Sequence, residues 1–397
     1  MTDPLLRFRD EFPILARTTY LVSNSLGAMP RTVPARLAEY ARMWEEQGVK
    51  AWAHGWWEMP VAAGDVIAPL LGAPAGSVVM LPNVSLAQAT VLSALDYSGQ
   101  RDEIVMTAHD FPSVRYMYEG LARRLGARIT VVPADASGIG VELEQLLAAI
   151  TERTRLVAIS HVLFRSAYVM DLAAICRRAH EVGALVSADA FHSVGVLPVD
   201  VRESGVDFLT GGVLKWLCGG PGGCFLYVNP EVSARHAPSL TGWQAHAHPF
   251  AFEPEMEYAP DASRWLNGTP VVPALFAATE GPRLVREAGI EAIRAKSIRQ
   301  TTRLIELADA RGYQVMAPRD PARRGGTVAF DLPHAYEMSQ LLLANDVLVD
   351  FRPGAGIRVA PHFYTTDSEV ERAIEIMDRG LETGEWRRFE GVARTVT

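Results

Sequence analysis

Residues 155–188 decide the fold, because two short apolar runs flank a helical pattern there: Arg155-Leu-Val-Ala-Ile159, Leu172-Ala-Ala-Ile-Cys-Arg-Arg-Ala-His-Glu-Val182 and Ala184-Leu-Val-Ser-Ala188. The outer runs are apolar on both faces, which is typical of strands covered on both sides. The middle run repeats apolar residues at three- and four-residue spacing, which indicates an amphipathic helix. Strand, helix and strand in this order predict neighbouring parallel strands.

The same alternation extends from about residue 75 to residue 230, with a further helical pattern at 141–150. We therefore expect an α/β fold with a mainly parallel, seven-stranded sheet. The predicted strands are Ser77–Leu81, Glu103–Thr107, Arg128–Val132, Arg155–Ile159, Ala184–Ala188, Phe208–Thr210 and Gly223–Val228.

The pattern changes after residue 270. Residues 271–312 predict long helices, and an α+β stretch follows: strands at 326–332, 347–351 and 356–360, a helix at 336–345 and a last helix from Asp367. We expect a large domain over residues 31–270, a smaller α+β C-terminal domain over 271–397, and an N-terminal segment, 1–30, that packs on the smaller domain.

Composition excludes several classes of protein. The 397 residues carry a net charge of −8 without a basic run, so a nucleic-acid partner is not expected. Neither a signal peptide nor a membrane-spanning run is evident, which predicts a cytoplasmic protein without a membrane partner. The three cysteines, Cys176, Cys218 and Cys224, lack paired metal-ligand spacing, so we expect neither a disulfide nor a metal site, and small-residue packing is the favoured role.

Lys215 is one of three lysines in a chain with thirty-five arginines. It lies among Val213, Leu214, Trp216 and Leu217, and loss of hydration there would lower its pKa. A neutral amine can form a Schiff base with a carbonyl compound. The sequence therefore predicts that Lys215 is the residue that binds a carbonyl cofactor.

Asp189 ends a predicted strand, one strand before Lys215. Pyridoxal 5′-phosphate (PLP) needs a lysine for its aldehyde and a buried carboxylate that keeps the ring nitrogen protonated. An aspartate after a strand is also a common turn former. With Lys215 on the next strand, the pair predicts a PLP site at the carboxyl edge of the sheet.

Several motifs resemble those of the kynureninase and class V aminotransferase superfamily: Asp189-Ala-Phe-His-Ser-Val-Gly195, Lys215-Trp-Leu-Cys-Gly-Gly-Pro-Gly222, Asn24-Ser-Leu-Gly27 and Asn267-Gly-Thr-Pro270. The similarity runs over nearly the whole chain. It implies a PLP enzyme of fold type I, with Lys215 and Asp189 as catalytic residues.

The resemblance also implies the residues around the cofactor. Asn83, the Val84 amide and Ser85 precede a helical run, whose free N–H groups suit a phosphate. Phe111 would stack on the pyridine ring, and His192 would lie beside Asp189.

Trp243 and Thr269 would reach the phosphate of a neighbouring subunit, which implies a homodimer with shared active sites. Arg358 resembles the arginine that holds the carboxylate of an amino acid substrate, a contact that suits its planar guanidinium. Asn24 and Ser25 are expected near that substrate, and Arg165 is a further candidate for an anion contact.

Four positions depart from the kynureninase pattern. Val114 replaces an aspartate of that pattern, Leu214 a tyrosine, and Ala167 a glycine. Gln244-Ala245 replaces an aromatic-glycine pair. Two of these changes remove polar groups near the cofactor. They predict a more apolar pocket and changed chemistry or substrate.

The leading hypothesis is a PLP enzyme that cleaves at Cβ of an α-amino acid with a bulky β-substituent, by kynureninase-like hydrolysis or by elimination as in C–S lyases. Transamination, epimerisation and decarboxylative deamination are alternatives within the superfamily. A non-catalytic PLP-binding protein is an alternative of another class. The side chain of the substrate stays open, because Trp52, His54, Trp56 and Trp57 either line an aromatic pocket or anchor an N-terminal helix.

Overall fold

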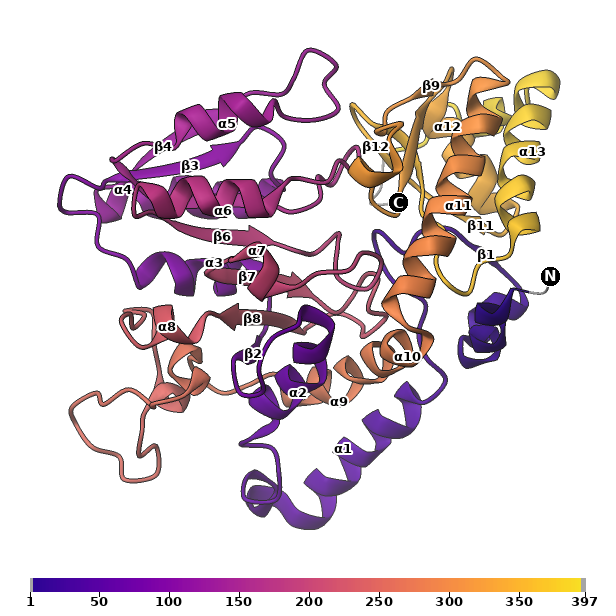
Figure 1. The fold of residues 1–397 in the computed structure, drawn as a ribbon. Helices are drawn as coiled ribbons and strands as arrows, with labels where there is room; N and C mark the ends of the chain where they lie inside the picture. Colours follow the sequence, from indigo (N-terminus) through magenta and orange to yellow (C-terminus); the bar gives the residue numbers. More distant parts are fainter. Residues whose placement is uncertain (1–2, 394–397) are drawn as a thin grey trace.

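The computed structural model describes residues 3–393, and its centre is a seven-stranded sheet (Figure 1). The spatial order is β2-β8-β7-β6-β5-β3-β4. The strands are β2 (Val78–Leu81), β3 (Glu103–Thr107), β4 (Arg128–Val132), β5 (Thr154–Ser160), β6 (Leu185–Asp189), β7 (Phe208–Gly212) and β8 (Cys224–Val228). All seven predicted strands are present, and their ends differ from the prediction by no more than two residues.

The sheet is mainly parallel, as expected, with one reversed strand. β8 runs antiparallel to both β2 and β7, whereas the other neighbours pair in parallel. The reversal follows from the connection, because the short loop at 213–223 contains no crossover helix and returns the chain directly. Lys215 lies in this loop.

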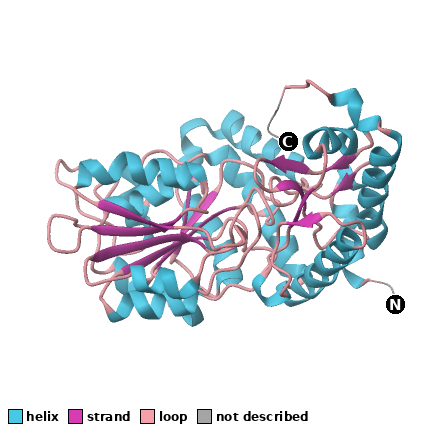
Figure 2. Cartoon of the chain, turned by 90° about the horizontal axis from the view of Figure 1, so that it is seen from above, coloured by secondary structure: helices cyan, strands magenta, loops and turns pink. Residues whose placement is uncertain are grey.

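Helices cover both faces of the sheet (Figure 2). Asn83 and Asp171 begin two of them as N-caps, each accepting a hydrogen bond from a backbone N–H of the first turn. The helices of this part are α1 (Val33–Gln47), α2 (Met59–Ile67), α3 (Val84–Ser93), α4 (Pro112–Leu125), α5 (Leu143–Ala149), α6 (Leu172–Glu181), α7 (Val201–Ser204) and α8 (Pro230–Ser233).

The second part of the chain contains a four-stranded antiparallel sheet with the strand order β12-β13-β10-β9. Its strands are β9 (Gln314–Val315), β10 (Val328–Asp331), β12 (Asp350–Arg352) and β13 (Gly356–Val359). Helices α11 (Ile290–Asp309), α12 (Ala335–Ala344) and α13 (Asp367–Thr383) share a core with this sheet. By contrast, α9 (Val272–Ala278) packs on α1 and α2, and α10 (Glu280–Ala288) contacts α2, α9 and α11. The predicted strands at 326–332 and 356–360 are present, whereas the strand predicted at 347–351 is divided into β11 (Val347–Leu348) and β12, which belong to different sheets. β9 was not predicted, because it is too short to show a periodicity.

The N-terminal segment packs on this second part. β1 (Thr19–Tyr20) pairs in parallel with β11 (Val347–Leu348). The ring of Phe12 lies 5.8 Å from that of Phe363. The predicted domain limits at residues 30 and 270 stay a prediction.

Short 3-10 helices complete the chain: η1 (Pro4–Glu11), η2 (Pro13–Ala16), η3 (Gly48–Trp52), η4 (Ala68–Leu71), η5 (Trp243–Ala245), η6 (Ala262–Trp265), η7 (Pro321–Arg323) and η8 (Glu385–Phe389). Within residues 3–393, none of the helices has both the length and the apolar character required to cross a bilayer.

Candidate active site

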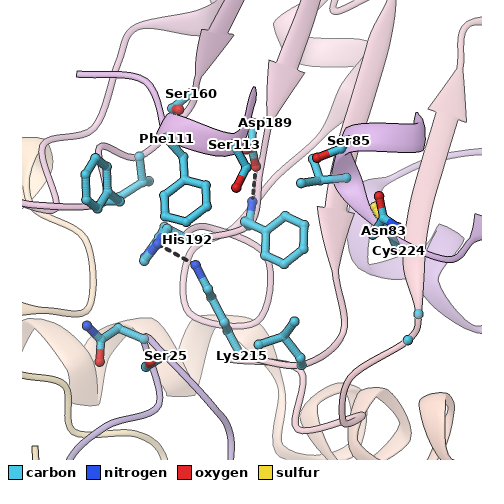
Figure 3. Close-up of a pocket in the computed structure, with 18 of the residues that line it drawn as sticks. Ser25, Asn83, Ser85, Phe111, Ser113, Ser160, Asp189, His192, Lys215 and Cys224 are labelled. Carbon is cyan, nitrogen blue, oxygen red and sulfur yellow. Dashed lines mark hydrogen bonds between the residues drawn. The ribbon is translucent and has the colours of Figure 1, made fainter. Parts of the chain in front are cut away.

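A cavity of about 380 Å³ opens at the carboxyl ends of the strands, where β5, β6 and β7 deliver Ser160, Asp189 and the Lys215 loop (Figure 3). Most of the predicted site residues line it: Asn24, Ser25, Asn83, Val84, Ser85, Phe111, Asp189, His192, Lys215 and Arg358. Arg165, Trp243 and Thr269 do not.

The amine of Lys215 points toward His192, and Nζ lies 2.6 Å from His192 Nε2 (Figure 3). Burial, followed by the positive charge of Arg358, lowers the pKa of Lys215, although the carboxylate of Asp189 opposes this shift. Burial and the charge of Lys215 also lower the pKa of His192. The imidazole is therefore neutral, and its Nε2 shares a hydrogen bond with the amine. This arrangement supplies an amine with an available lone pair.

Gly27 fixes the backbone around Lys215. Its N–H donates to the Leu214 carbonyl at 2.7 Å, and a Cβ at position 27 would lie 2.2 Å from the Lys215 carbonyl oxygen. Only glycine permits this approach. The N-terminal motif at 24–27 is thus packed directly against the lysine loop.

Asp189 is buried at the end of β6, and its Oδ1 accepts a hydrogen bond from the Phe191 N–H at 2.9 Å. Burial raises the pKa of this carboxyl, and the Phe191 hydrogen bond and Lys215 partly offset the effect. A carboxylate in such a place favours a nearby cation that can donate a hydrogen bond. A protonated pyridine nitrogen is such a group.

The start of α3 provides an anion site at the pocket. Asn83 caps the helix by accepting from the Leu86 N–H at 3.0 Å, and Val84 and Ser85 form the first turn. N–H groups of a first helical turn lack intrahelical partners and lie at the positive end of the dipole. These residues fit a phosphate.

Aromatic rings form two walls. Phe111, 38% exposed, meets Phe164 edge to face with centroids 5.3 Å apart. The Lys215 Nζ lies 5.7 Å from the Phe111 centroid and 5.1 Å from that of Phe191. The ring of Phe191 lies over Gly212, which has no side chain in the way. Sequence reasoning did not find Phe164 or Phe191, because their roles depend on how the loops fold over the sheet.

Arg358 is buried and held from several directions. It forms a two-pronged ion pair with Asp350, with Nε 2.8 Å from Oδ1 and Nη2 2.5 Å from Oδ2. Its Nη1 donates to the Phe164 carbonyl. With the Asn24 amide oxygen turned toward it, Asn24 accepts from Nε at 3.2 Å and from Nη2 at 3.3 Å. Asn24 therefore positions Arg358.

Arg165 does not reach the site, contrary to expectation. Its side chain is exposed and its guanidinium lies 5.3 Å from the centroid of the Phe164 ring, because the chain turns away from the cavity after Phe164. Arg352, which the sequence did not single out, lines the pocket instead.

Trp243 and Thr269 are both exposed and lie outside the cavity of their own chain. Of the N-terminal aromatic residues, Trp56 is buried against Tyr40 of α1 and packs with Phe276 of α9. This cluster anchors α1, and none of Trp52, His54, Trp56 and Trp57 lines the cavity of its own chain.

The departures have separate effects. Leu214 lines the pocket, whereas Val114 packs in the apolar core beside Tyr118. Ala167 adopts a φ of 58°, the left-handed conformation that favours the glycine expected there.

Lys296, on α11, is also buried. It is paired with Asp3 at 2.8 Å and donates to the Phe363 carbonyl at 2.7 Å, so it serves as a structural cation. Burial raises the pKa of the Cys218 thiol to about 12, which agrees with a packing role for this residue.

PLP fits these residues. The pocket combines an amine with a lowered pKa, a buried carboxylate, a helix start and aromatic walls, and each matches one part of the cofactor.

Residues 19–370 match the family model of aminotransferase class-V. Kynureninase from Pseudomonas fluorescens is 32% identical over 401 residues, which cover 98% of this chain and 95% of the relative. Kynureninase from Burkholderia pseudomallei (strain 1106a) is 31% identical over 409 residues, with 99% and 96% covered.

Solved structures share the fold. The apo cysteine desulfurase from Thermococcus onnurineus NA1 has a TM-score of 0.84 at 22% identity, over 96% of this chain and 99% of the other. The cystine C–S lyase C-DES in complex with cysteine persulfide has a TM-score of 0.83 at 21% identity, over 92% and 99%. The chain belongs to the class V aminotransferase family of PLP-dependent enzymes.

Proposed function

We propose that this enzyme acts on an α-amino acid with a bulky β-substituent and breaks a bond at Cβ. The observation that carries the proposal is the Lys215 amine, which lies 2.6 Å from a neutral His192 in a cavity that also contains Asp189 and Arg358. The relatives named kynureninase, about 31% to 32% identical over nearly the whole chain, support cleavage at Cβ.

The residues divide the work. Lys215 would bind the cofactor covalently, and Asp189 would contact its ring nitrogen. Phe111 would stack on the ring face, and Asn83 with the first turn of α3 would bind the phosphate. When bound, PLP supplies an electron sink for the bond broken at Cα. Arg358 binds the α-carboxylate and thereby orients the substrate.

Lys215 would also accept the proton that leaves Cα of the substrate. With PLP and substrate bound, the Lys215 Nζ would take this proton, because its lowered pKa keeps a lone pair available. His192 shares a hydrogen bond with Nζ and thereby holds the amine in place. Phe164 and Leu214 add apolar surface to the cavity.

Product analysis tests the reaction. With kynurenine, release of alanine indicates hydrolysis, whereas pyruvate and ammonia from a cysteine S-conjugate indicate elimination. We expect Lys215→Ala to lower either rate by at least about 100-fold. Lys50→Ala, at an exposed lysine, is the matched control. If the enzyme only exchanges amino groups with keto acids, transamination replaces the proposal, and a protein that binds PLP without turnover is the non-catalytic alternative.

Borohydride reduction tests the cofactor site independently of turnover. The chain contains three lysines, so peptide mapping of the reduced holoprotein assigns the attachment point directly. We expect the label on Lys215. A label on Lys50 or Lys296 contradicts the assignment.

We also propose a homodimer with shared sites. The ring centroid of Trp57 lies 4.7 Å from that of Trp243 and 4.7 Å from that of Phe250, and Phe252 stacks on Trp243. Together these rings form an exposed aromatic patch. Exposed patches of this kind mark interaction surfaces. A second copy that covers the patch would bring Trp243 and Thr269 toward the α3 phosphate site of its neighbour.

Mixing subunits tests this arrangement. A Lys215→Ala chain and a Thr269→Ala chain should regain activity when they are co-assembled, since one of the two sites in the hybrid is intact. Light scattering that reports only monomers, or hybrids without recovery, contradicts it.

A further inference from the structure

A second guanidinium faces the pocket beside Arg358. Arg352 ends β12 and Arg358 lies on the adjacent antiparallel strand β13. In the register of these strands, Asp350 stands directly opposite Arg358. Both arginines line the cavity, so the two neighbouring strands present two cations to it.

Asp350 joins the two arginines. Its carboxylate is 1% exposed, and its Oδ2 lies 2.5 Å from Arg358 Nη2 and 3.1 Å from Arg352 Nη2. The two guanidiniums therefore converge on one oxygen atom. Because one buried carboxylate offsets one of two positive charges, the cluster faces the pocket with a net charge of +1.

Both side chains keep donors for a ligand. Arg358 also donates from Nη1 to the Phe164 carbonyl and from Nε and Nη2 to Asn24, which leaves one Nη1 hydrogen. Arg352 donates to the Phe351 carbonyl. A guanidinium carries more N–H groups than these contacts use among the described residues. Arg352 is the more accessible of the two, with 23% of its side chain exposed against 3% for Arg358.

We propose that Arg352 and Arg358 bind one and the same substrate carboxylate, as a two-arginine clamp whose spacing Asp350 sets. This inference rests on the proposed function and specifies its substrate. A carboxylate can accept from both guanidiniums at once, and its single negative charge matches the net charge of the cluster.

The clamp also restricts the β-substituent. Once both arginines hold the α-carboxylate and Lys215 serves the cofactor, no cation remains among the described residues that line the cavity. Phe164, whose carbonyl is tied to Arg358, places an apolar ring beside the clamp. Substrates with an uncharged β-substituent are therefore favoured over those with a second acidic group.

Calorimetry on the holoprotein tests the clamp with 3-phenylpropanoate and with 3-phenylpropan-1-ol, which has a similar shape without the charge. We expect Arg352→Gln to weaken binding of the acid about 10-fold while binding of the alcohol stays unchanged. Arg352→Lys should fall between, because lysine keeps the charge and loses the planar fork. Arg165→Gln, an exposed arginine outside the cavity, is the control and should bind as wild type.

Three results overturn the clamp: acid binding by Arg352→Gln equal to wild type, equal weakening of acid and alcohol, or weakening confined to the dicarboxylate 4-(2-carboxyethyl)benzoate. The last result would mean that Arg352 binds a second carboxylate, on the β-substituent of the ligand. If Arg352→Gln fails to fold, Arg352→Lys decides, and acid binding equal to wild type refutes the inference. The assay requires no turnover, so its failure is distinct from failure of the proposed cleavage at Cβ.

Discussion

Replacing Gly212 by alanine tests how the wall beside Lys215 is built. A Cβ at position 212 would lie 2.0 Å from Phe191 Cζ and 2.2 Å from Cε1. Carbon atoms in contact are normally separated by about 3.5 to 4.0 Å, so the ring must move by more than an ångström. Overpacking of this kind costs roughly 1 to 3 kcal/mol. We expect the free energy of unfolding to fall by that amount.

The double variant Phe191→Ala/Gly212→Ala isolates the clash. Phe191→Ala removes the ring that supplies the three atoms nearest to a Cβ at position 212. The double variant should therefore be more stable than the sum of the two single changes by about 1 to 2 kcal/mol. Urea unfolding of all four proteins measures this coupling. Gly99→Ala is the control, since its Cβ would meet no atom within 4 Å. Additive changes, or a Gly212→Ala protein as stable as wild type, would refute the reasoning.

Three further predictions concern other groups. Since the pKa of Lys215 is lowered, its amine is neutral above that pKa, and the rate at which PLP loads onto the apoprotein should rise with pH and level off well below the ordinary lysine value of about 10.4, which stopped-flow absorbance checks. Lys296→Met leaves the carboxylate of Asp3 without its buried partner and should lower the free energy of unfolding by about 2 kcal/mol in urea, whereas wild-type stability would show the pair to be unimportant. Asn83→Ala removes the cap from the Leu86 N–H and should cost about 1 kcal/mol while weakening PLP binding in a fluorescence titration; unchanged affinity would place the phosphate elsewhere.

The strands of the large sheet could be predicted because burial on both faces leaves a continuous apolar run in the chain itself. Lys215 and Asp189 were equally visible, since a lysine in an apolar stretch and an acid at a strand end stand out against their immediate neighbours. These signals are local, and they follow from the composition of a few consecutive residues.

Contacts between distant segments carried no such signal. Nothing in the residues next to Arg165 and Arg352 tells which of the two lines the cavity. The β12–β13 pairing places Arg352 there, whereas the turn after Phe164 leaves Arg165 outside. The burial of Lys296 depends on Asp3, far away in the chain. The sequence by itself therefore determined the α/β class, the family resemblance and the central lysine and aspartate. The tertiary structure decided which arginines, rings and glycines surround them, because those choices depend on packing between residues that the chain brings together only when it folds.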